Sequence, residues 1–463
     1  MSASDDRLAE SEKLPPPQLQ QPATVAEESF LEKSLRALRN PPFARYMGGT
    51  AVSLVGTWMQ IAAQGYVMAT LTDRAFLLGV VNFASGVPML LLTFKGGSFA
   101  DRHDKRLILL LAQAVQITTA LALGWLVFTH RIAYWHVLII AVVSGIIAAF
   151  EVPADSALVP ELVEKEQIGV AIAIDRAIFH ATRFIGPAVA GLLIPALGLA
   201  SAFFVNAASF LALVFAILTL APRVRGSAEE EQKRAGGMKD GIAYVRGDKP
   251  TLSMIGLLAS STVFVSPIFI VMMPIYVTRI LGLGPDKLGY LMACSGIGSL
   301  TGALGLLTIP PEKRLGRMVI ASAGAALATL GFGLATNFYF AGGCMCVMSL
   351  CLSTNFGLAN TIVQERAPDY LRGRVSALAG LSFFGLMPFA SLGVPALADL
   401  IGMRTAIVLG AACYAVAAAW VLIGAGRRAC ANRPLTAAIQ REESQPVGAE
   451  PCPTETVAEA EGA

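Results

Sequence analysis

The chain has 463 residues, of which 55% are hydrophobic and only 14% are charged. A soluble domain carries about 25% charged residues to cover its surface, so this composition excludes a large water-soluble protein. The net charge of +3 does not indicate a nucleic-acid partner, since the basic residues do not form one patch. Cys344 and Cys346 fall in an apolar run with no histidine nearby, so we expect neither a metal site nor a cofactor.

Apolar runs of about 20 residues or more recur along the chain and predict an all-α polytopic membrane protein. We expect twelve transmembrane helices, arranged as two six-helix bundles. The spans lie near residues 43–70, 76–98, 106–129, 133–157, 168–195, 199–220, 252–280, 286–309, 317–335, 338–363, 373–397 and 404–425.

The longest polar stretch between spans, 221–250, divides the chain into two halves. The expected domains are a disordered tail with a short surface helix (1–42), a first bundle (43–220), a linker (221–250), a second bundle (251–428) and a disordered tail (429–463). Pro15-Pro16-Pro17 supports disorder in the first tail, and Pro434, Pro446, Pro451 and Pro453 support it in the last.

Basic residues gather in alternate loops, and such loops face the cytoplasm. They include Arg102, Lys105, Arg106, Lys165, the 221–250 cluster, Lys313, Arg314, Arg366, Arg372, Arg374, Arg427 and Arg428. The intervening loops hold few basic residues. We therefore expect a multi-pass protein of the cell inner membrane with both termini in the cytoplasm.

The two halves repeat short patterns at nearly constant offsets. Leu78-Gly79 and Ser85-Gly86 have counterparts in Leu288-Gly289 and Ser295-Gly296. Pro187 and Pro195-Ala196-Leu197 have counterparts in Pro388 and Pro395-Ala396-Leu397. Such internal similarity is expected of two related six-helix bundles.

The stretch from Gly96 to Arg106 holds a dense charge cluster between two apolar runs. It cannot lie in hydrocarbon, so it predicts a short loop at the membrane surface. The residues expected to act there as a gate are Gly97, Asp101, Arg102, Lys105 and Arg106.

Charged residues inside a span are costly and mark functional sites. Glu151, Asp175, His180 and Arg183 lie in the fourth and fifth spans, and Asp175 and Arg183 are about two helical turns apart. One interpretation is a polar pathway for substrate or protons, in which a carboxylate or His180 exchanges a proton. The alternative is static ion pairs that hold the two helices together.

Gln60 and Gln64 are four residues apart in the first span. They could present amides to a substrate or form hydrogen bonds between helices, and the sequence leaves both open. In the fifth span, Gly186, Pro187 and Gly191 predict close helix packing and a bend.

The Gly96–Arg106 loop resembles the signature between helices 2 and 3 of the major facilitator superfamily. The chain also resembles the bacterial exporter branch that includes the enterobactin exporter. The resemblance rests on Gly56-Thr57-Trp58-Met59-Gln60, Leu71-Thr72, Pro88, Pro160-Glu161-Leu162-Val163, Arg183-x-x-Gly186-Pro187 and Leu371-Arg372-Gly373-Arg374-Val375. It implies a monomeric secondary transporter that exports a siderophore, drug-like compound or metabolite by alternating access, driven by protons.

Three other functions compete with export. An importer of a small metabolite has the same fold. An enzyme would need a nucleophile with a base or a metal set on adjacent spans; of four histidines, three lie at or near span ends, so we expect no enzyme. A sensor or scaffold would carry a sizeable soluble domain, and the sequence shows none.

Overall fold

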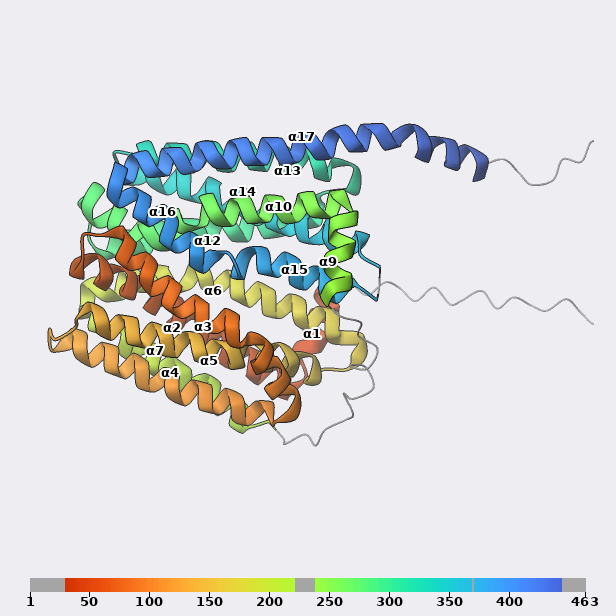
Figure 1. Ribbon diagram of the computed structural model, residues 1–463. Coiled ribbons are helices and arrows are strands. Elements are labelled where there is room, and N and C mark those ends of the chain that lie inside the picture. Colours follow the sequence, from red (N-terminus) through yellow and green to blue (C-terminus); the bar gives the residue numbers. More distant parts are fainter. Residues whose placement is uncertain (1–29, 221–237, 369, 444–463) are drawn as a thin grey trace, which may run out of the picture.

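The computed structural model of the chain describes residues 30–220, 238–368 and 370–443. Within these ranges the chain is helical, without β-strands, and most helices run side by side along one axis (Figure 1). The first half contains α1 (Phe30–Leu38), α2 (Pro41–Leu71), α3 (Ala75–Arg102), α4 (Lys105–Phe128), α5 (Tyr134–Glu161), α6 (Ile168–Leu197) and α7 (Ala200–Leu218). The second contains α9 (Met238–Gly247), α10 (Lys249–Phe264), α11 (Met273–Ile275), α12 (Pro285–Gly305), α13 (Arg314–Leu334), α14 (Phe338–Arg366), α15 (Arg372–Phe384), α16 (Met387–Ile401) and α17 (Met403–Glu443).

Eleven helical segments of the described chain are long and apolar enough to cross a membrane. The twelfth span is α2, which is 31 residues long but less apolar than the others. It carries Gln60 and Gln64, and it packs against both α7 and α6, so part of its surface meets protein rather than lipid. The twelve-helix prediction is therefore confirmed, with one span that hydropathy alone underrates.

Two spans are broken at prolines, which remove a backbone donor and clash with the preceding turn. In the seventh span, Pro267 precedes the π-helix η2 (Ile268–Met272), and Pro274 lies in α11, which a second π-helix, η3 (Tyr276–Ile280), follows. In the eleventh span, α15 ends at Phe384 and α16 begins at Met387, with Pro388 in its first turn.

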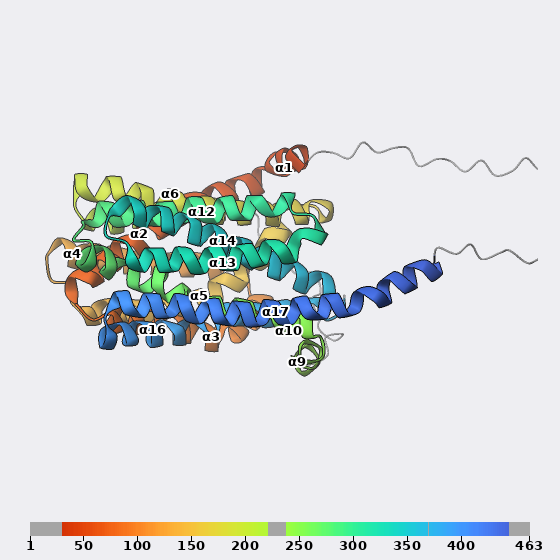
Figure 2. The ribbon, with the colours of Figure 1, turned by 90° about the horizontal axis from the view of Figure 1, so that it is seen from above.

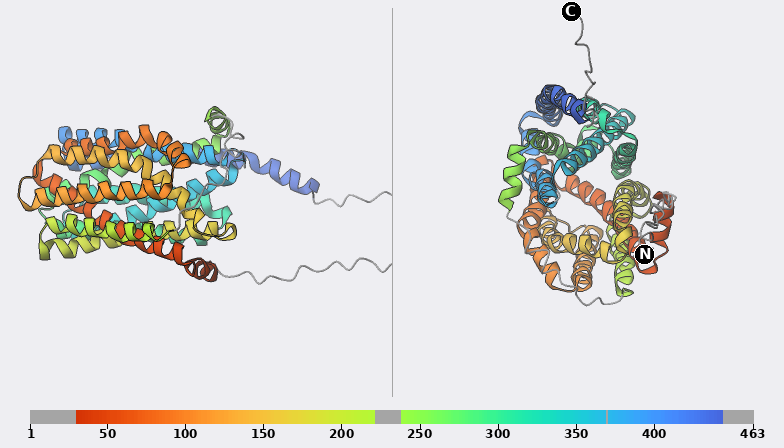
Figure 3. Two further views of the ribbon diagram at one scale, coloured as in Figure 1. Left: turned by 90° about the horizontal axis from the view of Figure 1, so that it is seen from below. Right: turned by 90° about the vertical axis from the view of Figure 1, so that its right-hand side faces the viewer.

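The helices form two bundles that lie side by side, as the end-on view in Figure 3 shows. Helices α2–α7 make the first bundle and α10–α17 the second. The bundles meet along two seams, one between α3 and α16 and the other between α6 and α12.

At the first seam, backbones approach so closely that only glycine fits. A β-carbon at Gly79 would collide with the carbonyl oxygen of Ser391, and one at Gly86 with the ring of Pro388. Small residues at such crossings allow the close packing typical of membrane helices.

The second seam uses the equivalent glycines of the other half, but the proline of α6 lies against the first of these glycines, whereas the proline of α16 lies against the second. Gly289 of α12 lies against Pro187 and Gly191 of α6, and Gly296 lies against Phe184. The sequence repeat Gly79/Gly86 and Gly289/Gly296 therefore corresponds to a structural repeat at the two seams.

Helices α1 and α9 and the end of α17 lie at the same end of the molecule (Figures 1 and 2). We call it the α9 end. The turn after α3 also lies there, because α2 runs away from this end and α3 returns to it. The seam contacts extend from the other end, where Gly79 and Gly289 lie near the start of α3 and of α12, to the middle of the molecule, where Gly296 lies against Phe184 beside Arg183.

The prediction of a disordered tail from residue 429 is wrong for residues 429–443, which continue α17 to Glu443. Residues with high helix propensity, such as alanine, leucine, glutamine, arginine and glutamate, make up most of this stretch and outweigh Pro434. The predicted disorder of 1–29 and 444–463, and the linker stretch 221–237, fall outside the described residues.

Candidate functional site

Arg183 lies at the middle of α6, where the two bundles meet. It is fifteen residues from the first residue of α6, or about 22 Å along the axis at 1.5 Å per residue. Its guanidinium carbon is 5.5 Å from the ring centre of Trp58 on α2 and 5.6 Å from that of Phe269 in η2. Because Phe269 belongs to the second bundle, Arg183 contacts both halves of the molecule at mid-depth.

Two further polar groups near Arg183 are buried without a hydrogen-bond partner among the described residues. They are Nε1 of Trp58 and Nδ1 of His180, which lies one turn before Arg183. Phe179 packs edge-on against Trp58 with ring centres 5.7 Å apart. The surroundings of Arg183 therefore contain aromatic rings and two nitrogen atoms that lack a hydrogen-bond partner among the described residues.

Glu151 lies in a polar cluster inside the first bundle. Gln113 and Gln116 of α4 donate their side-chain amides to its two carboxylate oxygens, at 2.7 and 2.5 Å. One turn further on, Asp155 accepts a hydrogen bond from the Tyr46 hydroxyl of α2. The sequence analysis missed these partners, although Gln113 and Gln116 are visible as polar residues three apart in an apolar run.

Asp175 of α6 lies near this cluster, since its charge acts on both Asp155 and Tyr46. Its nearest basic group is the adjacent Arg176, at 4.0 Å. Among the described residues, neither His180 nor Arg183 forms an ion pair with any of these carboxylates. The predicted pathway thus divides into an acidic cluster within the first bundle and a cationic centre between the bundles.

Gln60 takes part in helix packing in this structure. Its side-chain oxygen accepts a hydrogen bond of 2.8 Å from Asn206 of α7, which is buried. Gln64, one turn further along α2, is partly buried.

The charged stretch at the α9 end is mostly helical rather than a loop, because α3 continues to Arg102, α4 begins at Lys105, and only His103 and Asp104 lie between them. Lys105 forms an ion pair with Glu161, which joins the start of α4 to the end of α5. Asp101 and Arg102 are exposed, and Nε of Arg106 is buried without a hydrogen-bond partner among the described residues. A β-carbon at Gly97 would meet open space, so close packing here depends on its neighbour Gly96, which lies against the carbonyl of Ala149.

The glycine–proline segment of α6 contacts two different helices. Gly186 packs on Val55 and Trp58 of α2, whereas Pro187 and Gly191 face Gly289 of α12. This segment therefore holds Arg183 in place relative to both bundles.

A carboxylate that the sequence analysis missed links the bundles at the end opposite α9. Asp399, near the end of α16, accepts hydrogen bonds from the backbone N–H groups of Ala75 (2.8 Å) and Phe76 (3.0 Å) at the start of α3. A carboxylate is favoured there because a helix N-terminus carries unpaired donors and partial positive charge. Beside it, Asp73 forms an ion pair with Arg279 of the second bundle.

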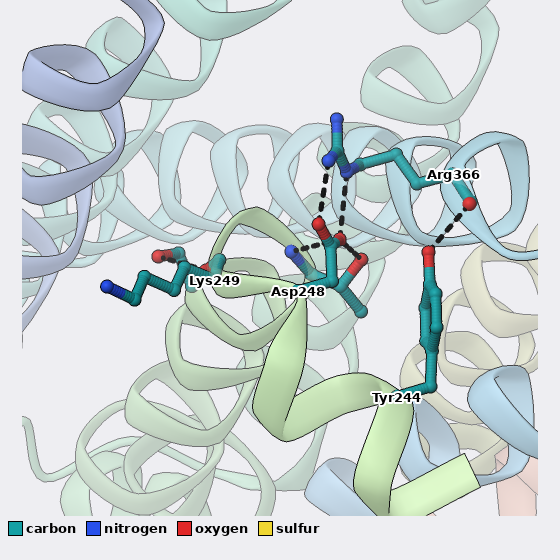
Figure 4. Close-up of polar contacts among 6 residues, drawn as sticks. Tyr244, Asp248, Lys249 and Arg366 are labelled. Atoms are coloured by element: carbon teal, nitrogen blue, oxygen red, sulfur yellow. Dashed lines mark hydrogen bonds and ion pairs between the residues drawn. The ribbon is translucent and has the colours of Figure 1, made fainter. Parts of the chain in front are cut away.

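A second polar cluster fixes α9 to the second bundle (Figure 4). Arg366 at the end of α14 donates two hydrogen bonds to Asp248, at 2.9 and 2.7 Å, and the Tyr244 hydroxyl donates to the carbonyl of Arg366 at 2.7 Å. The side chain of Lys249 points away from Arg366. These Arg366 bonds lower the pKa of Asp248 to about 2.

Within the described residues, no group of three His, Cys, Asp or Glu side chains is placed to hold a metal ion. The polar centres described above could contact an organic substrate or exchange protons.

Comparison with known families matches residues 33–440 to the model described as "Transmembrane secretion effector". The staphyloferrin A transporter of Staphylococcus aureus is 25% identical over 374 residues, which cover 79% of this chain and 92% of that protein. The multidrug efflux pump Tap of Mycobacterium tuberculosis is 27% identical over 429 residues, covering 89% of this chain and 98% of Tap.

Solved structures show the same fold at low sequence identity. A bacterial homologue of the human lysosomal transporter Spinster superposes with a TM-score of 0.66 at 15% identity, over 84% of this chain and 97% of that one. The D-xylose–proton symporter superposes with a TM-score of 0.62 at 14% identity, over 85% and 97% of the two chains.

Proposed function

We propose that this chain, which belongs to the transmembrane secretion effector family of the major facilitator superfamily, exports a small molecule in exchange for protons. It is a multi-pass membrane transporter. The proposal adds the direction, the coupling ion and the mechanism, which is alternating access by a monomer in the cell inner membrane. Candidate cargoes are a siderophore, a drug-like compound or a metabolite.

The observation that carries the proposal is the position of the seams. The glycine contacts and the Asp399 and Asp73 contacts all join the bundles away from the α9 end. The distribution of basic residues predicts that the α9 end faces the cytoplasm. With that orientation, the bundles are joined from the outer end down to the level of Arg183, and a substrate would reach the centre from the cytoplasm.

Alternating access then requires the bundles to rock about the centre. The outer seam contacts would separate while the Gly97–Arg106 loop approached the second bundle. Arg102, exposed at the end of α3, would take part in the contacts of that second state.

The acidic cluster supports proton coupling. Glu151, Asp155 and Asp175 place three carboxylates in one region of the first bundle. Carboxyl groups inside membrane spans are typical of proton relays. Protonation would then change with access to water as the bundles move.

Export rather than uptake is supported by two features. The relatives reported above include a multidrug efflux pump and a siderophore transporter, and Gly186-Pro187 resembles the glycine–proline signature of antiporters.

Transport into everted membrane vesicles tests direction and coupling together. Vesicles with an imposed pH gradient, acidic inside, should accumulate the exported members of a panel of siderophores, drugs and metabolites. Glu151→Gln and Asp175→Asn should each reduce gradient-driven uptake severalfold, because each removes a carboxyl that can carry a proton.

Glu166→Gln is the matched control, because Glu166 is an exposed acid in the turn before α6 and its loss should leave uptake unchanged. Full gradient-dependent uptake in both Glu151→Gln and Asp175→Asn would exclude these carboxyls from coupling. Accumulation only in right-side-out vesicles would mean import.

A further inference from the structure

The geometry around Arg183 points to a binding subsite for a carboxylate of the transported molecule; we infer that the cargo is an organic anion. This inference rests on the proposed transport function and names the chemical class of the cargo.

The guanidinium of Arg183 lies deep inside the membrane-spanning region. Arg183 lies at mid-depth, far too deep for its guanidinium to reach the membrane surface, and it is wedged between Trp58 and Phe269. Aromatic faces attract a cation, but they do not neutralise it. A permanent positive charge at this depth faces a water-filled cavity or pairs with an opposite charge, and it marks a substrate or ion pathway.

No carboxylate of the described residues forms an ion pair with Arg183. Glu151 is bonded to glutamines, and Asp155 to a tyrosine. Asp399 binds the start of α3. Within the described residues no acidic side chain lies within ion-pair distance of Arg183, so the protein does not supply the missing negative charge from this part of the chain.

Two buried ring nitrogens near Arg183 have no hydrogen-bond partner among the described residues. Trp58 Nε1 is a donor only, and it is buried without a partner among the described residues beside Arg183. Nδ1 of His180 is likewise buried and unbonded among those residues. A carboxylate with two oxygens could accept from the guanidinium and the indole at once, whereas a cation would be repelled.

The residues around Arg183 come from both bundles, so binding there can affect how the bundles move. Arg183 and Trp58 belong to the first bundle and Phe269 to the second. A carboxylate bound by Arg183 competes with the attraction between the guanidinium and the Phe269 ring. Anion binding should therefore differ in strength between conformations, which is the condition for a substrate to shift them.

Binding of small matched probes to the purified full-length protein tests the inference. The probes are benzoate, its neutral analogue benzamide and its cationic analogue benzylammonium. Benzoate should bind at least about tenfold more tightly than benzamide, a difference of about 1.4 kcal/mol, and benzylammonium should bind most weakly.

Variants at Arg183 should change this preference selectively. Arg183→Gln should remove the difference between benzoate and benzamide. Arg183→Lys should keep part of it, because lysine retains the charge but not the planar pair of donors. The control is Arg176→Gln, two turns earlier on the same helix and with a side chain 67% exposed, which should bind all three probes as the wild type does.

If Arg183→Gln does not fold, Trp58→Phe replaces it as the test. This variant keeps an aromatic ring and removes the indole donor, so benzoate should bind about threefold more weakly, by the loss of one hydrogen bond. Equal affinity of the wild type for benzoate and benzamide, absence of binding by both, or a preference that survives Arg183→Gln would overturn the inference.

The outcome separates this inference from the proposed function. Proton-driven export of cations that survives Arg183→Gln would uphold the transport proposal and reject the anion subsite. A benzoate preference that depends on Arg183, in a protein that moves no compound with a pH gradient, would uphold the subsite and reject proton-coupled export.

Discussion

Adjacent glycines before the charged loop have different surroundings. The sequence marks Gly96 and Gly97 alike, and the family pattern singles out Gly97. The structure places only Gly96 against the backbone of α5, at Ala149, while Gly97 faces open space. Which of two neighbours faces another helix depends on how α3 is rotated about its axis, and two consecutive small residues do not determine that rotation.

Alanine substitutions at these two positions should therefore have opposite effects. Gly96→Ala forces a methyl group into the carbonyl of Ala149 and should destabilise the protein by about 1–3 kcal/mol. Gly97→Ala has room for the methyl group and raises helix propensity, so it should be neutral or stabilising by up to about 1 kcal/mol. Apparent melting temperatures in detergent measure both, and equal losses at the two sites would contradict the assigned rotation of α3.

The charged residues of the membrane interior could be found from the sequence, but their partners could not. A carboxylate such as Glu151 stands out in an apolar run at once. Its partners Gln113 and Gln116 come from a different helix, and pairing them requires the relative height and rotation of α4 and α5. Arg183 likewise stands out in the sequence, but its contact with Phe269 cannot be predicted because Phe269 lies in the other half of the chain.

At the scale of whole helices, hydropathy predicts the existence of nearly every span. It fails to show where spans break, because Pro267, Pro274 and Pro388 interrupt helices without lowering their apolar character. It also underrates α2, whose polar residues meet other helices. Proline content likewise fails to predict the extension of α17 to Glu443, because helix-favouring residues surround Pro434.

The bonds of Asp248 with Arg366 should couple α9 and α10 to the end of α14. Asp248→Asn, Arg366→Gln and the double variant form a cycle, and we expect a coupling of about 1 kcal/mol, since the pair is charge-assisted but partly exposed. Unfolding by added SDS, followed by circular dichroism at neutral pH, measures it.

The pH dependence of this coupling has a definite sign. Arg366 lowers the pKa of Asp248 to about 2, below the value of about 3.9 for an unfolded chain. The stabilisation is therefore complete above about pH 4 and is lost as the pH falls through 2. A coupling that already weakened between pH 7 and pH 5 would mean that another group carries it.

For the molecule as a whole, the sequence repeat predicts two related bundles. It does not predict that the repeated glycines lie where the bundles meet. Gly79 and Gly289 occupy equivalent places at the two seams, against Ser391 and Gly191 respectively. A repeat constrains each half to the same fold, whereas the docking of the halves also depends on contacts such as those of Asp399, which a single sequence does not reveal.

The hydrogen bonds of Asp399 across the first seam should stabilise the conformation described here, in which the bundles are joined at the end opposite α9. Its carboxylate satisfies two N–H groups at the start of α3, and loss of such a cap costs about 0.5–2 kcal/mol. Asp399→Ala should therefore shift the equilibrium away from the joined outer seams by about twofold to thirtyfold. Arg131 and Tyr339 are exposed positions in different bundles at the end opposite α9. Spin labels at Arg131→Cys and Tyr339→Cys should show a larger fraction of long label-to-label distances in Asp399→Ala than in the protein with Asp399.

The control for Asp399→Ala is Asp286→Ala, which removes a carboxylate at the same end. Asp286 pairs with its neighbour Lys287 on α12, and among the described residues its side chain forms no hydrogen bond or ion pair with the other bundle, so its loss should leave the distances unchanged. Arg279→Gln breaks the adjacent pair with Asp73 and should weaken the outer seam further, because Arg279 and Asp399 lie on different helices of the second bundle. If Asp399→Ala and Asp286→Ala gave the same distance distribution, the seams would be held by glycine packing alone, and the carboxylate would serve only to complete the first turn of α3.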